Sequence, residues 1–310
     1  MRLYLKNIGM IKEADVKLDG LTVIAGENDT GKSTIGKSLF ALAKARLFVK
    51  GNNYLDKIEW LFDKISKKQL INENSFLKLD SIEVDFNKKI AKRGNFKFLD
   101  VIFIETPFIF NLYKTLSGIS KANSVIDFDI EYNYLWWDLY IKLSHKAKTF
   151  SKIDFSDLIK YIEKIVNGKF VRYDEIDKDK WVFVKDKELE MDNVAMGIKQ
   201  FAILYALIKN GYLTKDRILV FDEPEVHLHP KWQIEYAKLI IELVKRGIKV
   251  LITSHSPYML EALDIFAKKE KIICNSYFAY EGYIKEDKNF QKSITKLVAP
   301  MKELKRLRYE

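Results

Sequence analysis

The feature that most constrains this chain is a glycine-rich run between an apolar segment and an amphipathic one. The run Ala25–Thr34 reads AGENDTGKST and matches the pattern G-x-x-x-x-G-K-[ST] in full. The apolar segment Leu21–Ile24 precedes it, and apolar residues at helical spacing follow it. A glycine turn before a helix can also serve packing alone. The strand-loop-helix context instead favours a loop whose backbone N–H groups wrap phosphate oxygens at a helix N-terminus.

This loop predicts a nucleoside triphosphate site and names its residues. Lys32 is expected to reach the β- and γ-phosphates, and the Ser33 hydroxyl is expected to bind Mg²⁺. The residues expected to contact the nucleotide are Gly26, Glu27, Asn28, Asp29, Thr30, Gly31, Lys32, Ser33 and Thr34.

Polar residues follow two further apolar runs that are typical of buried parallel strands. Asp222 and Glu223 come directly after Ile218–Phe221, and His255 follows Val250–Thr253. Because ligands bind at the carboxyl ends of such strands, Asp222 is expected to hold Mg²⁺ and Glu223 to act as general base for an attacking water. His255 could contact the γ-phosphate. The alternatives are a turn or helix start for the acidic pair and a purely structural role for the histidine.

The order of apolar patterns predicts an α/β fold with an N-terminal antiparallel β meander, a mostly parallel core sheet and a largely helical insertion. Residues 1–54 and 191–310 are expected to form one head, and residues 55–190 an insertion with strands that return to it. The pattern predicts strands near 3–9, 14–18, 21–24, 82–86, 101–105, 181–184, 218–221 and 250–253, and helices near 31–50, 55–65, 132–145, 155–166, 198–208 and 231–245.

Charge and composition set limits on the partners. The formal net charge is +10, from 53 Lys and Arg against 43 Asp and Glu. This excess either attracts nucleic-acid phosphates without sequence specificity or simply solvates the surface. No N-terminal signal and no apolar run of about 18 residues is present in the sequence, which favours a cytoplasmic protein without a membrane span.

The remaining chemically interesting residues favour structural roles. His227 and His229 have neither a cysteine nor a third histidine nearby, which argues against a zinc site. His145 is interpreted as structural. Cys274, the single cysteine, follows Ile272 and Ile273 and is expected on an apolar core strand.

Taken together, the motifs resemble those of ABC-type ATPases of the SMC, RecF and OLD kind. They also resemble prokaryotic AAA family ATPases that share an Asp-Glu-Pro-Glu-x-x-Leu-His-Pro run. The residues that carry the resemblance lie within Met1–Leu47 and Asp192–Leu260: LYLKNIG at 3–9, the phosphate loop, DEPEVHLHP at 222–230 and TSHSP at 253–257.

The resemblance implies that ATP is sandwiched between two heads, so that a signature loop from one chain completes the site of the other. The run AMGIKQ at 195–200 occupies the corresponding position, which implies roles for Gly197 and Lys199 at the partner's γ-phosphate. Met196 stands where that family usually has a serine and cannot donate a hydrogen bond to phosphate. An ordinary helix start is the alternative interpretation. Glu105, at the end of its strand, is a candidate for the residue that links nucleotide to the helical lobe.

The resemblance further implies a homodimer or higher homo-oligomer and an ATP-driven switch in phage defence or DNA repair. The switch would couple to DNA or to a separate effector or nuclease chain. A nucleotide-gated scaffold with little turnover is the main alternative, since Met196 weakens the trans contact. A P-loop kinase fits less well, because Glu223 and His255 suit water activation and sensing.

Overall fold

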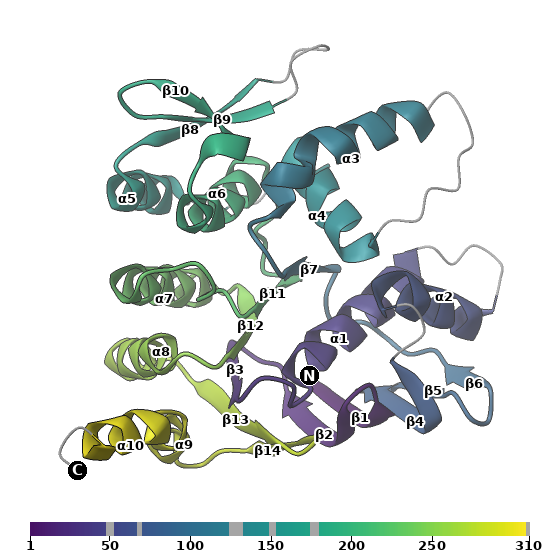
Figure 1. Ribbon diagram of the computed structural model, residues 1–310. Coiled ribbons are helices and arrows are strands. Elements are labelled where there is room, and N and C mark those ends of the chain that lie inside the picture. The colour runs from purple at the N-terminus through teal and green to yellow at the C-terminus, as the bar shows by residue number, and fades with distance from the viewer. Residues whose placement is uncertain (48–52, 67–69, 124–132, 149–152, 174–179, 308–310) are drawn as a thin grey trace.

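The computed structural model describes residues 1–47, 53–66, 70–123, 133–148, 153–173 and 180–307. One eleven-stranded sheet runs through it, in the order β6-β5-β4-β1-β2-β14-β13-β3-β12-β11-β7. Helices cover this sheet, and a smaller sheet with its own helices stands beyond the β7 edge (Figure 1). The predicted end of the first helix near Lys50 and the start of another at Tyr132 lie outside the described residues.

The central strands are parallel and buried. β3 (Leu21–Gly26), β12 (Lys249–Ser254), β11 (Arg217–Asp222) and β7 (Asp100–Ile104) pair in that order, and β13 (Cys274–Tyr280) runs parallel to the other side of β3. All six residues of β3 and of β11 are buried, as expected for strands covered on both faces. The carboxyl ends of these strands therefore meet at one edge of the sheet.

The other half of the sheet is largely antiparallel. β1 (Arg2–Ile8) pairs with β2 (Ile11–Lys17) and β4 (Ile71–Leu79), which leads to β5 (Ile82–Asp85) and β6 (Ile90–Lys92). The expected N-terminal pair of strands is therefore present. It does not border β3, because the hairpin of β13 and β14 (Tyr283–Glu286) lies between β2 and β3.

Helices pack on both faces of the core. Alternate residues of β3 face opposite sides, so that Val23 belongs to one hydrophobic cluster and Ile24 to the other. α1 (Lys32–Leu47) and α2 (Tyr54–Ser66) cover the Ile24 face, and α6 (Met196–Lys209), α7 (Pro230–Lys245) and α8 (Pro257–Lys269) cover the Val23 face (Figure 1). α9 (Phe290–Leu297) and α10 (Ala299–Leu307) follow β14. No helix formed by the described residues is long and apolar enough to cross a bilayer.

The 55–190 segment mixes helices and strands. Besides α2 and β4–β7, it contains α3 (Ile109–Asn123), α4 (Tyr134–Ser144) and α5 (Ser156–Val166). A separate three-stranded sheet is formed by β8 (Lys169–Tyr173), β9 (Lys180–Val184) and β10 (Glu188–Glu190), and the short 3-10 helix η1 (Met191–Asn193) leads back to α6. The sequence pattern predicted β5, β7, β9, α2, α4 and α5 here, but not α3 or the other strands.

A buried cluster of four charged side chains ties α1, β7 and α4 together. Lys44 Nζ lies 2.6 Å from Asp100 Oδ1 and 2.7 Å from Asp138 Oδ1, and Lys142 pairs with the same two carboxylates. Burial alone would raise the pKa of Asp100, but Lys142 and Lys44 lower it to about 2. This charged cluster is electrically balanced, so loss of one member leaves an unpaired buried charge.

We therefore expect Lys44→Met to lower the free energy of unfolding by about 3 kcal/mol, measured by urea denaturation at pH 7. The matched control is Lys78→Met, because Lys78 pairs with Glu83 at 2.6 Å on the exposed surface. Such exposed pairs contribute at most about 1 kcal/mol. Equal effects of the two substitutions would contradict a structural role for the charged cluster.

Candidate functional site

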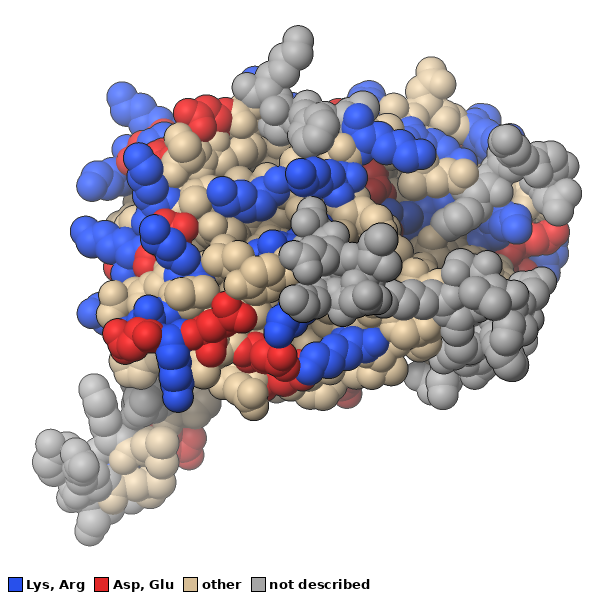
Figure 2. Space-filling view, turned by 90° about the horizontal axis from the view of Figure 1, so that it is seen from above, with Lys and Arg blue, Asp and Glu red and all other residues tan. Residues whose placement is uncertain are grey.

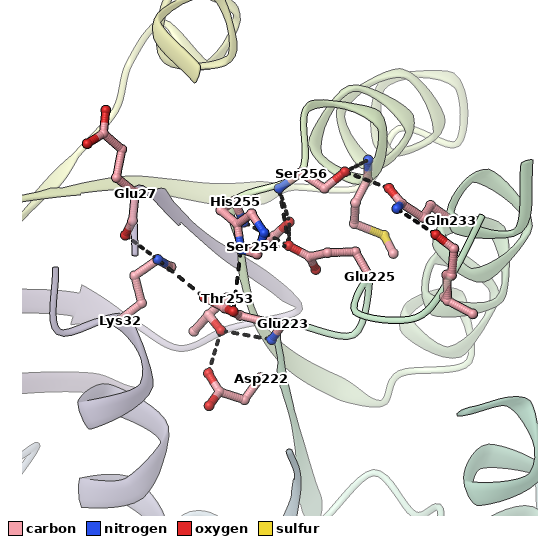
Figure 3. Close-up of polar contacts among 12 residues, drawn as sticks. Glu27, Lys32, Asp222, Glu223, Glu225, Gln233, Thr253, Ser254, His255 and Ser256 are labelled. Atoms are coloured by element: carbon pink, nitrogen blue, oxygen red, sulfur yellow. Dashed lines mark hydrogen bonds and ion pairs between the residues drawn. The ribbon is translucent and has the colours of Figure 1, made fainter. Parts of the chain in front are cut away.

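The phosphate loop and the ends of β11 and β7 enclose an open pocket of about 410 Å³. This volume is in the range of small-ligand sites. The pocket is lined by Asn28, Asp29, Ser33, Glu105, Thr106, Pro107, Asp222, Glu223 and Val226. Three sequence-predicted elements, the loop and the two acidic residues, are thus brought together. Figure 3 shows Lys32, Glu223 and His255 linked by polar contacts beside Asp222.

The phosphate loop is held in shape by its own backbone. Lys32 is buried, and its Nζ donates to the Glu27 carbonyl oxygen at 2.5 Å; the Thr30 hydroxyl donates to the same oxygen at 2.8 Å. Gly31 has φ +86°, and a Cβ atom there would come within 2.9 Å of the Ile11 side chain. A larger residue would therefore displace either the loop or β2.

Asp222 is a buried carboxylate at the end of β11. It accepts hydrogen bonds from the Thr253 hydroxyl, at 2.6 Å, and from the Ser33 hydroxyl. Burial raises the pKa of Asp222 to about 6 despite these hydrogen bonds. The carboxylate and the Ser33 hydroxyl are hard oxygen donors of the kind that Mg²⁺ takes at phosphate sites, so the residues present fit that ion.

Glu223 is placed by an unusual backbone conformation. Its φ is +49°, in the left-handed region, and its N–H donates to the Thr253 carbonyl oxygen at 3.1 Å. The side chain lies 3.4 Å from Lys32 Nζ and 3.4 Å from His255 Nδ1. His255 and then Lys32 hold the pKa of Glu223 below its usual value although burial opposes them. Strained backbone of this kind concentrates at functional sites.

His255 lies between two carboxylates. Its Nδ1 is 3.4 Å from Glu223 Oε2 and 3.5 Å from Glu225 Oε1. The interaction with Glu223 raises the pKa of His255, against the effect of burial. The sequence led us to expect a histidine beside a γ-phosphate; here its Nδ1 faces the two glutamates.

Glu225 has a role that its sequence context alone does not predict. Its buried Oε1 accepts from the Ser254 hydroxyl at 2.7 Å, from the His255 N–H at 2.8 Å and from the Ser256 N–H at 3.1 Å (Figure 3). Glu225 therefore fixes the loop after β12 to the loop after β11. The only signal in the sequence was its place in the DEPEVHLHP run.

Glu105 connects the pocket to α1 and α4. It follows β7 directly, and its carboxylate lies 3.3 Å from Lys37 Nζ of α1 and accepts from Trp136 Nε1 of α4 at 3.0 Å. Together with Thr106 and Pro107 it lines the pocket. Glu105, the candidate named from the sequence, therefore contacts both α1, which follows the phosphate loop, and α4.

Residues 195–200, all of them described, do not line this pocket. Gly197 packs so closely that a Cβ would lie 3.0 Å from the His227 carbonyl oxygen and 3.0 Å from the Trp232 ring. The side chain of Lys199 is buried and donates to Asn111 Oδ1 at 2.7 Å. The expectation that Lys199 faces outward to a phosphate is therefore not met in this structure. Its ammonium group instead holds α6 to α3.

His229, His145 and Cys274 lie outside the pocket and have structural contacts. His229 caps α7, since its Nδ1 accepts from the Lys231 N–H at 3.3 Å, and His145 caps the end of α4 through its N–H. Ile273 is 77% exposed and precedes β13, which begins at Cys274. The expected apolar core strand therefore starts later than predicted, and Cys274 is only partly buried.

Comparison with known proteins identifies the family of this chain and several proteins similar to it. Residues 21–261 match the family described as "AAA domain, putative AbiEii toxin, Type IV TA system". The Septu protein PtuA of Bacillus thuringiensis is 24% identical over 301 residues, which cover 85% of this chain and 73% of that protein. An uncharacterized protein of Methanocaldococcus jannaschii is 29% identical over 101 residues, 30% of this chain and 12% of that protein.

A solved structure of an SMC head bound to the C-winged helix domain of ScpA superposes with a TM-score of 0.51 at 14% identity, covering 92% of this chain and 96% of that chain. That likeness concerns the fold. With the family match, it confirms the predicted α/β head and the resemblance to ABC-type ATPases of the SMC, RecF and OLD kind.

The buried Asp222 carboxylate predicts a pH-dependent stability. A pKa raised from 3.8 to about 6 means that ionisation of Asp222 lowers the free energy of unfolding of the nucleotide-free protein by about 3 kcal/mol. The folded state favours the protonated acid, so this contribution is present below pH 4 and is lost as the pH rises through 6. Asp222→Asn should therefore stabilise the protein at pH 7.5, by thermal unfolding in EDTA, and lose that advantage near pH 4.

The control is Asp19→Asn, which changes an exposed carboxylate and should leave the unfolding temperature nearly unchanged at both pH values. A destabilisation by Asp222→Asn that is the same at pH 7.5 and pH 4 would contradict the assigned pKa.

Proposed function

This chain belongs to that AAA-domain family as a P-loop ATPase of the ABC and SMC type, and we propose that it binds and hydrolyses ATP as a switch between two copies of itself. The observation that carries the proposal is the meeting of Lys32, Asp222, Glu223 and His255 at the ends of adjacent parallel strands. Such a constellation suits phosphoryl transfer to water, where positioning and charge stabilisation do most of the work.

In the proposed reaction each residue has a separate task. Lys32, held in the loop, neutralises phosphate charge, and the loop N–H groups from Gly26 to Thr34 orient the phosphate oxygens. Ser33 and Asp222 hold Mg²⁺, which when bound supplies neutralisation of the charge that develops on the phosphates. Glu223 orients the attacking water and accepts its proton.

The pairing of Glu223 with His255 favours the ionised form of the proposed base. His255 and Lys32 keep the Glu223 carboxylate ionised, so that it can accept a hydrogen bond from water near neutral pH. Glu225 keeps His255 in place through three hydrogen bonds around one oxygen. We assign Glu225 a positioning role, since its Oε1 is bound by Ser254, His255 and Ser256 and the residue does not line the pocket.

A second copy is needed to complete this site in our proposal. The N-terminus of α6, at Ala195–Gly197, lies away from the pocket of its own chain and could face the pocket of another. The 55–190 segment would transmit closure to DNA or to a separate effector chain, with Glu105 as the residue that joins the pocket to α4. A cellular role in phage defence or DNA repair is part of this proposal.

Met196 supports a second candidate, a nucleotide-gated scaffold that hardly turns ATP over. Its thioether cannot donate a hydrogen bond to a partner's phosphate, and Lys199 is buried elsewhere. Steady-state hydrolysis with and without DNA separates the two functions, because a scaffold would stay at background under every condition.

Glu223→Gln should slow ATP hydrolysis about 10²- to 10³-fold while ATP still binds, because glutamine keeps the size of the side chain but cannot accept the proton. Radiolabelled ATP turnover measures the first effect, and the mass of the ATP-bound species measures a longer-lived dimer. The control is Glu270→Gln, a surface residue paired with Lys245. Unchanged turnover in Glu223→Gln would refute the assigned base.

Met196→Ser should raise turnover several-fold if the N-terminus of α6 faces a second copy's phosphate, because serine adds a hydrogen-bond donor there. Ile273→Ser, at a distant exposed site, is the control for added polarity. Background turnover in both the natural chain and Met196→Ser would favour the scaffold.

A further inference from the structure

A second cavity, of about 340 Å³, lies between α5 and α7 and is separate from the nucleotide pocket in its lining residues. We call it the α5–α7 groove. Its polar and aromatic lining consists of Tyr161, Lys164, Lys231, Trp232, Glu235 and Lys238. Figure 1 shows α5 and α7 on the side of the head opposite α1.

The groove carries an excess of positive charge. Lys238 Nζ pairs with Glu235 Oε1 at 3.1 Å, and the Tyr161 hydroxyl donates to the same carboxylate. Lys164 and Lys231 are exposed, and no described residue forms an ion pair with either. Lys231 acts on Glu235 from beyond ion-pair distance, where it helps to lower the pKa of that carboxylate. Two exposed ammonium groups on facing helices therefore line the groove. Figure 2 shows many Lys and Arg side chains, with some Asp and Glu among them, on the face seen from above.

Aromatic side chains are held rigidly at the same place. The Trp232 ring packs edge-on against Phe201, with centroids 5.6 Å apart, and remains partly exposed. Tyr161 is fixed through its hydroxyl to Glu235. A ring that is fixed by packing and still partly exposed is suited to stacking, since little conformational freedom is lost on binding.

We propose that the α5–α7 groove binds single-stranded nucleic acid, with phosphates at Lys164 and Lys231 and a base against Trp232. Basic residues that follow a backbone, combined with aromatic rings that take bases, are the usual composition of such sites. A nucleobase also offers N–H donors to Glu235, whereas an acidic peptide side chain offers that carboxylate no donor. This proposal names a binding site for the DNA coupling suggested under the proposed function. Only the cellular purpose of the groove, not its binding of nucleic acid, rests on that proposed function.

The position of Trp232 gives the groove a route to the ATPase site. A Cβ atom at Gly197 would lie 3.0 Å from the Trp232 ring, so the ring directly abuts the N-terminus of α6. A base stacked on Trp232 would therefore press on the segment proposed to face the second copy's nucleotide. Strand binding is expected to change ATP turnover through this contact.

The test measures fluorescence anisotropy of a fluorescein-labelled dT12 oligonucleotide with the full chain at low salt and without ATP. Lys164→Ala combined with Lys231→Ala should weaken binding about tenfold and flatten the dependence of log K on log salt by about 1.4, the value for two phosphate contacts on a single strand. The control is Lys288→Ala with Lys292→Ala, which removes the same charge at exposed positions elsewhere and should change affinity less than twofold.

A second arm changes the probe. An abasic 12-mer should bind about tenfold more weakly than dT12, because base stacking contributes roughly 1–3 kcal/mol per base. Equal affinity of abasic and dT12 probes, equal loss in both double variants, or displacement of dT12 by polyglutamate at matched charge would each overturn the proposal, the last in favour of an acidic protein partner. ATP turnover of the natural chain, measured without oligonucleotide, tests the proposed ATPase separately. The binding experiment contains no ATP, and the two double variants leave the nucleotide pocket intact, so either proposal can fail without the other.

Discussion

The parallel register of β3, β12 and β11 is the constraint on which the site depends. Ile24, Thr253 and Asp222 lie side by side in one row across the three strands. Thr253, in the middle, uses its hydroxyl to hold Asp222 and its carbonyl oxygen to hold the Glu223 N–H. A slip of one residue would turn Thr253 to the opposite face and separate these groups. The apolar residues that bury these strands therefore also fix the chemistry at their ends.

Several features of the site carry an energetic cost that this burial must offset. Glu223 adopts a left-handed backbone conformation, Asp222 loses its hydration, and Glu225 leaves one buried oxygen without a hydrogen-bond partner. Each costs on the order of 1–3 kcal/mol. Because they cluster in the short run from Asp222 to Glu225 at the end of β11, the cost is confined to the part of the chain where the proposed function uses it.

Much of the head could be predicted from sequence, because strong local patterns coincide with it. The apolar runs of β3, β11 and β12, the phosphate loop and the acidic pair each have a short-range signature. The role of Glu225 has no short-range signature, since its hydrogen-bond partners lie about 30 residues further along the chain. The burial of Lys199 could not be predicted, because a motif position does not reveal which way a helical side chain points. β4 and β10 were missed because their exposed, polar residues weaken the alternating pattern on which strand prediction depends.

The two sets of contacts along α4 have a mechanical consequence. Near the pocket, Trp136 binds the Glu105 carboxylate that also meets Lys37; farther along the helix, Asp138 and Lys142 bind Lys44 and Asp100. A helix fastened at two points along its length cannot pivot about either one alone. α4 is therefore tied to α1 and β7, and we expect any rotation of α5 and the three-stranded sheet relative to α1 to leave α4 in place.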